Sequence, residues 1–209
     1  MPENESGFVP ALTEDEKAAA EFSKYLPGSI IRNAELSTLP AAALARAEEK
    51  SSLLINSADY RPGNFETAQV ISHPDGSKTY VVTQTKTYGA GSKHTEELSY
   101  FLDTVGDQLM GSGELRKAIT NQVEYFKDKP FVGSTRNEES GKGKFLGARR
   151  LEIMNAFSQM KYGLPLYSDT RMSPLAIDVW EGFVQSGKAT KFKEGPNDRY
   201  VFKKAELLK

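Results

Sequence analysis

The sequence predicts an α/β (α+β) fold in which helices flank a central sheet, and three observations lead to this prediction. The chain has 209 residues, enough to bury a core without disulfide bonds. β-branched and aromatic residues on both sides of the His73–Gly76 turn predict a β-hairpin. Apolar residues at helical spacing after Thr13 and after Ser173 predict amphipathic helices.

The composition excludes several classes of protein. The chain has no cysteine and two histidines, which excludes a disulfide framework and a cysteine nucleophile, and we expect no metal site. A formal net charge of −1 gives no overall field that steers the chain to nucleic acid or to an anionic membrane. No window of about eighteen apolar residues is present, and the polar Met1–Ser6 lacks the features of a signal peptide. We therefore expect a soluble protein of the cytoplasm that does not bind membranes.

Residues 1–62 are predicted to form an N-terminal helical segment. Thr13 and Glu16 have the spacing of a capping box, so a helix is expected to begin there and to end at Pro27-Gly28. A second helix is expected from Ala41 to about Leu54. These helices are candidates for contacts with a partner protein or with a second copy of the chain.

Residues 63–209 are predicted to form an α/β domain. The hairpin comprises strands at 65–72 and 77–88, and both His73, at its turn, and His94 are interpreted as solvated. A helical insertion is expected at about 92–127, with helices at 95–110 and 114–126 separated by Gly111-Ser112-Gly113. The apolar residues that suggest the second of these helices are Leu115, Ile119, Val123 and Phe126.

A Gly/Lys-rich loop at 141–147 runs directly into a predicted helix that ends near Gly163. The first turn of a helix leaves four N–H groups without partners and is the positive end of the helix dipole, so it favours phosphate. Arg149 and Arg150 add positive charge. The loop has no Gly-Lys-Ser/Thr ending, so it is not a Walker A loop, and a solvated basic loop is the competing interpretation.

The remaining chain predicts a further strand, helix and strand. A short apolar strand is expected at 163–170, ending in Ser168 and Asp169. Ser173 and Pro174 are a typical N-cap and first residue of a helix, which Gly187 ends. A last strand is expected at about 199–203.

The C-terminal third resembles the cofactor-binding half of GNAT-type N-acetyltransferases, in particular GNAT-like proteins of tailed bacteriophages. Lys142–Gly147 is in register with the family's Arg/Gln-x-x-Gly-x-Gly/Ala loop, and Ser173-x-x-Ala176-x-x-x-Trp180 is similar to a later Asn-x-x-Ala-x-x-x-Tyr pattern. The resemblance implies a central mixed sheet flanked by helices, to which residues 1–62 are an addition. A phage protein is expected in the host cytoplasm or in the virion.

The resemblance implies an acyl-CoA-dependent N-acyltransferase. Such an enzyme transfers an acetyl group directly from acetyl-CoA, its co-substrate, to an amine on a small molecule or a protein. The backbone amides of the family's loop hold the pyrophosphate of acetyl-CoA. The positions in this chain that the resemblance assigns to the cofactor are Lys142, Gly143, Lys144, Phe145, Leu146, Gly147, Ala148 and Ser173.

Tyr167 and Glu139 are the candidate catalytic residues. Many members of the family place a Tyr that protonates the leaving thiolate where this chain has Trp180, and an indole N–H cannot replace it. Tyr167 is therefore the candidate acid, and Glu139 is a candidate base for the amine. The competing interpretations are a packing aromatic residue and a solvated carboxylate.

Two functions stay open at this point. The basic loop and helix start favour the acyltransferase. Phe145, where the family has a glycine, and Trp180 favour the alternative, a catalytically inactive GNAT-like binding or structural protein that is virion-associated or modulates the host. Nucleic-acid binding by residues 142–150 is disfavoured, because aromatic stacking partners do not alternate with the charges.

Overall fold

The structure, a computed structural model, describes residues 11–52, 64–88, 94–120, 129–141 and 146–204, and confirms the predicted α+β class. The helices are α1 (Glu14–Tyr25), α2 (Ala41–Ser52), α3 (Leu146–Tyr162) and α4 (Pro174–Gln185), with short 3₁₀ turns η1 (Leu36–Thr38) and η3 (Glu139–Gly141). The strands are β1 (Ile30–Ala34), β2 (Thr67–Ser72), β3 (Lys78–Tyr88), β4 (His94–Val105), β5 (Gln108–Thr120), β6 (Phe131–Asn137), β7 (Ala189–Glu194) and β8 (Asn197–Phe202).

Within the described residues, β1 to β6 form one six-stranded sheet in sequential order, and every neighbouring pair is antiparallel. β7 and β8 form a separate antiparallel pair. Tyr167 connects the two sheets through a parallel bridge to Phe131 and an antiparallel bridge to Val201. The strand expected at 163–170 is thus reduced to isolated bridges, and the mixed character implied by the resemblance is confined to them.

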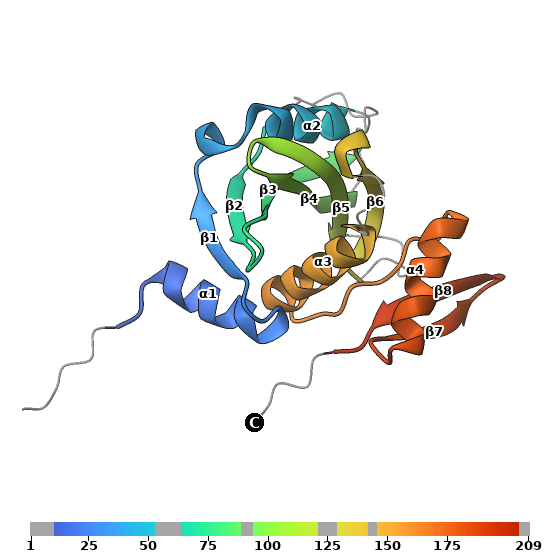
Figure 1. Cartoon of the computed structure of the whole chain (residues 1–209). Coiled ribbons are helices and arrows are strands. Elements are labelled where there is room, and N and C mark those ends of the chain that lie inside the picture. Colours follow the sequence, from blue (N-terminus) through green and yellow to red (C-terminus); the bar gives the residue numbers. More distant parts are fainter. Residues whose placement is uncertain (1–10, 53–63, 89–93, 121–128, 142–145, 205–209) are drawn as a thin grey trace, which may run out of the picture.

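Helices cover both faces of the curved six-stranded sheet (Figure 1). On one face, Ala43 and Ala47 of α2 pack in a cluster that includes Tyr100 of β4. On the opposite face, Phe22 of α1 and Phe157 of α3 belong to a second, larger cluster. Because both faces are covered, strand residues on both faces are buried.

The predicted ends of several elements are confirmed. Thr13 and Glu16 form the capping box of α1, and the Ser173 side chain accepts the N–H of Ala176 at the start of α4. Gly163 follows α3 with φ of +68°, a left-handed conformation that favours glycine. The hairpin at His73–Gly76 joins β2 and β3 as predicted. The sequence did not predict β7.

The helical insertion predicted at about 92–127 is wrong for the described residues, because β4 and β5 occupy 94–105 and 108–120 as strands. Apolar residues four positions apart lie on one face of a helix, but they also lie on one face of a strand, where side chains alternate with a period of two residues. Leu115 is fully buried whereas Ile119 is 56% exposed, so they do not form a common buried stripe. Val123 and Phe126 lie outside the described residues.

The segment predicted to be helical at 1–62 also contributes a strand to the sheet. β1 pairs with β2 over five residues, and α1 lies against β1 and α3. Phe22 of α1 is completely buried in the cluster that α3 covers. The described residues 11–52 therefore pack on the rest of the chain and contribute to both hydrophobic clusters.

Candidate functional site

A groove opens at the edge of the six-stranded sheet, where β6 and the segment around Tyr167 separate. The two segments are joined by hydrogen bonds from Val132 N to Tyr167 O (3.0 Å) and from Tyr167 N to Pro130 O (2.9 Å). Beyond this point the chain at Ser168 bonds to Tyr200 of β8 instead. The edge of β6 after Val132 therefore faces a hollow that α4 borders on its other side.

The groove consists of two hollows that share Thr135, Leu151, Ser173 and Ala176, and we name it the β6–α4 groove. The wider hollow, of about 240 Å³, is also lined by Val132, Gly133, Ser134, Asp169, Arg171, Met172 and Trp180. The narrower hollow, of about 130 Å³, is also lined by Arg136, Asn137, Gly147, Arg150, Leu175 and Val179. Residues of β6, α3 and α4 thus form one continuous surface.

Two of the predicted cofactor residues, Gly147 and Ser173, lie in this groove although they are far apart in the sequence. Leu146 begins α3, and Ala148 packs against the core beside it. Lys142, Gly143, Lys144 and Phe145 lie outside the described residues. The first turn of α3 therefore meets the first turn of α4 across the narrower hollow.

The start of α3 gives the narrower hollow a positive end. The first N–H groups of an α-helix have no partner within the helix and carry the positive end of its dipole. A Cβ atom placed on Gly147 would meet no atom of the described residues within 4 Å, so these residues leave the backbone there open to a ligand. Such a helix start is suited to an anion such as phosphate.

The groove arginines whose side chains have no partner among the described residues differ from those that the sequence suggested. Arg149 and Arg150 were expected to add positive charge to the loop, but Arg149 pairs with Asp75 and Arg150 pairs with Asp103. By contrast, Arg136 and Arg171 are exposed and line the groove, and their side chains make no ion pair or hydrogen bond with any described residue. These two guanidinium groups are available to a ligand.

The two predicted catalytic residues lie elsewhere. The Tyr167 ring packs edge-on against Phe192 at 6.3 Å, with the Lys129 ammonium over its face. Glu139 lies in η3, and neither Glu139 nor Tyr167 is among the described residues that line the groove. The neighbouring Glu138 forms an ion pair with Arg46 of α2, in which Glu138 Oε1 lies 2.6 Å from Arg46 Nη2.

Asp169 is the carboxylate that lines the wider hollow. Its Oδ1 atom accepts the N–H and the hydroxyl of Thr170, which leaves Oδ2 without a partner in the described residues. Trp180 lines the same hollow but is 2% exposed, because its ring stacks on Tyr200 and packs against Phe183 and Phe202. The described lining of the groove therefore offers a carboxylate but no phenol.

Arg150 connects three elements beneath the groove. Its buried guanidinium donates from Nε to Asp103 of β4 (2.6 Å) and from both terminal nitrogens to Oδ1 of Asn137 in β6 (3.2 Å). Gly111 and Gly113 of β5 leave space for this side chain, since a Cβ on Gly113 would lie 2.7 Å from Arg150 Cδ. The position of α3 relative to β6, and hence the shape of the groove, is set by this crossing.

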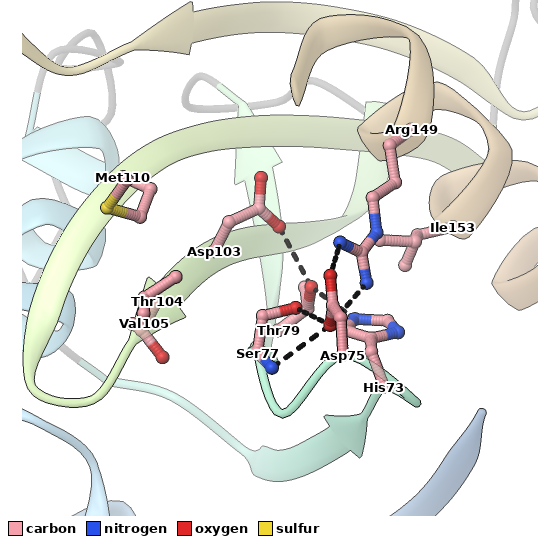
Figure 2. Close-up of a pocket in the computed structure, with 10 residues that line it drawn as sticks. All are labelled: His73, Asp75, Ser77, Thr79, Asp103, Thr104, Val105, Met110, Arg149 and Ile153. Atoms are coloured by element: carbon pink, nitrogen blue, oxygen red, sulfur yellow. Dashed lines mark hydrogen bonds and ion pairs between the residues drawn. The ribbon is translucent and has the colours of Figure 1, made fainter. Parts of the chain in front are cut away.

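A separate hollow of about 180 Å³, the His73 cavity, lies between the β2–β3 turn, the end of the β4–β5 hairpin and α3 (Figure 2). Its lining residues are His73, Asp75, Ser77, Thr79, Asp103, Thr104, Val105, Met110, Arg149 and Ile153. Asp103 lines this cavity and is also the partner of Arg150, which lines the groove. The two hollows are therefore separated by this ion pair.

His73 is buried, so the prediction of a solvated histidine is wrong. His73 is 7% exposed. Its Nδ1 lies 3.0 Å from Ser29 Oγ, and its Nε2 lies 3.0 Å from Thr79 Oγ1. Burial, assisted by the charge of Arg149, lowers the pKa of His73 to about 4. The Arg149 guanidinium and the Ser77 hydroxyl hold the pKa of Asp75 well below its usual range. At neutral pH the imidazole is thus neutral and Asp75 is ionised.

No model of a known protein family matches the chain, and no curated protein matches its sequence. Among the described helices, none is long and apolar enough to cross a bilayer. The described His, Asp and Glu side chains form no group that could hold a metal ion. Function therefore has to be inferred from the residues of the groove.

Proposed function

We propose that the β6–α4 groove binds acyl-CoA and that the protein is an acyl-CoA-dependent N-acyltransferase of GNAT type. The observation that carries this proposal is the meeting of Gly147, at the start of α3, with Ser173, at the start of α4, in one hollow. These are the two positions that the sequence resemblance assigns to the cofactor and that the structure describes in contact with a hollow.

The charges and shape of the groove support a ligand of this kind. A diphosphate at the first turn of α3 would accept hydrogen bonds from free backbone N–H groups. Arg136 and Arg171, which have no partner among the described residues, would pair with phosphate oxygens. Leu151, Ala176 and Val179 give the groove an apolar wall for the ligand's uncharged arm.

Asp169 is the residue that we assign as the base in this reaction. The nitrogen of a neutral amine attacks the thioester carbonyl carbon, a C–N bond forms, and the C–S bond breaks to release the CoA thiolate. The proton that the nitrogen loses passes to the free Oδ2 of Asp169. Asp169 takes the role that the sequence suggested for Glu139, because Asp169 lines the groove and Glu139 does not.

A second candidate, a binding protein without chemistry, is favoured by Trp180. The indole cannot protonate a leaving thiolate, and its ring is held by three aromatic neighbours. In that case the groove would bind CoA without turnover. Release of free thiol from acetyl-CoA in the presence of amines separates the two candidates: the acyltransferase releases it and the binding protein does not.

Acetyl-CoA should raise the melting temperature of the protein. A ligand that binds only the native state at about 100 times its Kd stabilises it by about 2.7 kcal/mol, which is several degrees for a chain of this size. Differential scanning calorimetry measures the shift. No shift at millimolar acetyl-CoA would remove the groove from consideration as a CoA site.

Gly147→Asp is the variant that tests the location. A Cβ at this position meets nothing within 4 Å, and an acidic residue in the first turn of a helix suits the dipole, so the fold should persist. The carboxylate would repel a diphosphate, and affinity for CoA should fall at least ten-fold. Gly182→Asp in α4, whose Cβ also meets nothing within 4 Å, is the matched control and should keep full affinity. Equal affinity of both variants would contradict the location.

A further inference from the structure

We infer that the His73 cavity is a second binding site, for a small aliphatic ammonium ion held by the carboxylate of Asp103. This site is made of different residues from the β6–α4 groove, and it does not depend on acyl transfer. The inference follows from which hydrogen-bonding positions in the cavity are already occupied, and from the apolar side chains that face them.

The hydrogen bonds at the inner end of the cavity run in one direction. The Thr79 hydroxyl donates to Asp103 Oδ1 (2.8 Å), so Thr79 Oγ1 can only accept from His73 Nε2. A neutral imidazole with its proton on Nε2 has an acceptor at Nδ1, which accepts a hydrogen bond from the Ser29 hydroxyl. The polar hydrogens of Ser29, His73 and Thr79 are therefore all committed within the protein.

Acceptor positions, in contrast, are left over. Asp103 accepts one hydrogen bond at Oδ1 from Thr79 and one at Oδ2 from Arg150, whereas each carboxylate oxygen can accept two. The Ser77 hydroxyl donates to Asp75 and the Thr104 hydroxyl donates to Lys78 O, so both keep oxygen lone pairs. The hydrogen-bonding positions that these side chains leave open are therefore acceptors, which suits a ligand that donates hydrogen bonds.

Arg149, a cation that lines the cavity, donates to Asp75 and not to the open acceptor positions of Asp103. Arg149 directs both terminal nitrogens to Asp75, at 2.5 and 3.2 Å, and lies with Asp75 on one side of Asp103 in Figure 2. Met110 and Thr104 lie on the other side of Asp103 in the same view. The Asp103 side chain lines the cavity and is 13% exposed. Its unused acceptor positions are thus open to a ligand that enters the cavity.

The uncharged part of the lining selects the rest of the ligand. Val105, Met110 and Ile153 are aliphatic, and a volume of about 180 Å³ suits a chain of a few carbon atoms. An alkylammonium ion supplies three N–H donors and a positive charge at one end and an apolar chain at the other. A carboxylate or a phosphate of the same size would instead lie beside the carboxylates of Asp75 and Asp103, and both terminal nitrogens of Arg149 are already directed to Asp75.

Titration with n-butylammonium chloride at pH 7, followed by methyl NMR of the intact protein, tests the site. The methyl signals of Val105, Met110 and Ile153 should shift together and saturably. n-Butanol, with the same chain and no charge, should bind at least ten-fold more weakly, and n-butyrate should give no saturable shift. Equal shifts with n-butyrate, or no saturable shift with n-butylammonium, would overturn the inference.

Two variants with a matched control locate the binding. Val105→Trp fills the mouth of the cavity at a residue that is 55% exposed, so the fold should tolerate it and the shifts of Met110 and Ile153 should disappear. Ile119→Trp makes the same kind of change at an equally exposed residue outside the cavity and should leave binding unchanged.

Asp103→Asn should weaken n-butylammonium at least ten-fold where the variant folds. Arg150 is buried and pairs with the Asp103 carboxylate, so this variant is used only if its NMR spectrum is that of the native fold. If it does not fold, the result with Val105→Trp alone decides where n-butylammonium binds. Retention of full affinity in folded Asp103→Asn, or in Val105→Trp, would refute the assignment.

Discussion

His73 and Asp75 are two residues apart on the β2–β3 turn, and their environments favour opposite responses to acid. Asp75 is held ionised by Arg149 and Ser77, so its proton binds only at a pH well below the usual range. His73 is surrounded by Ser29, Thr79 and the Arg149 guanidinium, and burial keeps it neutral until the pH approaches 4. Of the two residues, only His73 should therefore affect stability between pH 7 and pH 5.

His73 should make the protein less stable as the pH falls from 7 to 5. The pKa of a histidine is about 6.5 in the unfolded chain and falls to about 4 for His73 in the folded protein, so the unfolded state binds more protons in this window. By linkage, the free energy of unfolding should fall by about 2 kcal/mol over these two pH units. Urea unfolding at several pH values measures it. His73→Gln should remove most of this slope, and an unchanged slope in the variant would contradict the burial argument.

The partners of the arginines on α3 could not be predicted from the sequence. Arg149 and Asp75 are 74 positions apart, and Arg150 and Asp103 are 47 positions apart, so each pair is fixed by the register of the whole sheet. The places of Gly147 and Ser173 at the starts of two helices could be predicted, because a helix start and an N-cap are local patterns. Arg136 and Arg171 were not predicted as groove residues, because they too are brought together by the fold and not by a local pattern.

At the scale of elements, β5 is shaped by the helix that crosses it. Gly111 and Gly113 lie on the face covered by α3, where Arg150 and Met154 fill the space that side chains would take. Gly133 on β6 similarly lies against the Glu114 and Arg116 pair. In the sequence Gly111 and Gly113 suggested a break between helices, whereas in the structure they permit close packing within a strand.

Gly113→Ala should destabilise the protein by about 1–3 kcal/mol, the usual range for overpacking. The added Cβ would lie 2.7 Å from Arg150 Cδ and 3.0 Å from Met154 Sδ, and both side chains are buried. Gly182→Ala is the matched control. It lies in α4 with nothing within 4 Å of the added Cβ, so it should stabilise by about 0.5–1 kcal/mol. Chemical denaturation measures both, and a neutral Gly113→Ala would contradict the crossing of Arg150 over β5.

Elements marked by a cap or a turn were predicted well. Elements whose spacing of apolar residues fits both a helix and a strand were not. The capping box of α1, the hairpin turn and the Ser173-Pro174 start of α4 each depend on neighbouring residues, and all are confirmed. β4 was missed although Leu98, Tyr100 and Leu102 alternate along it and are buried under α2. Phe101, between them, is buried on the other face, so no polar face marks the strand.

At the scale of the whole molecule, the groove is lined by β6 and α3 on one side and by α4 on the other. Figure 1 shows α4 beside β7 and β8, next to the six-stranded sheet. Leu166, Tyr167 and Ser168 join the two parts by backbone hydrogen bonds to both sheets. The packing of Trp180 on Tyr200 and Phe202 completes the core of the smaller unit. This arrangement leaves the edge of β6 accessible to a ligand between two well-packed parts.

A crystal structure of the protein with bound CoA tests the central claim most directly. The proposal predicts the diphosphate within hydrogen-bond distance of the backbone N–H groups of Gly147 and its neighbours, beside Arg136 or Arg171. The uncharged arm should follow Leu151 and Ala176 toward Asp169 in the wider hollow. CoA bound at another surface, or absent from the groove at saturating concentration, would contradict the proposal.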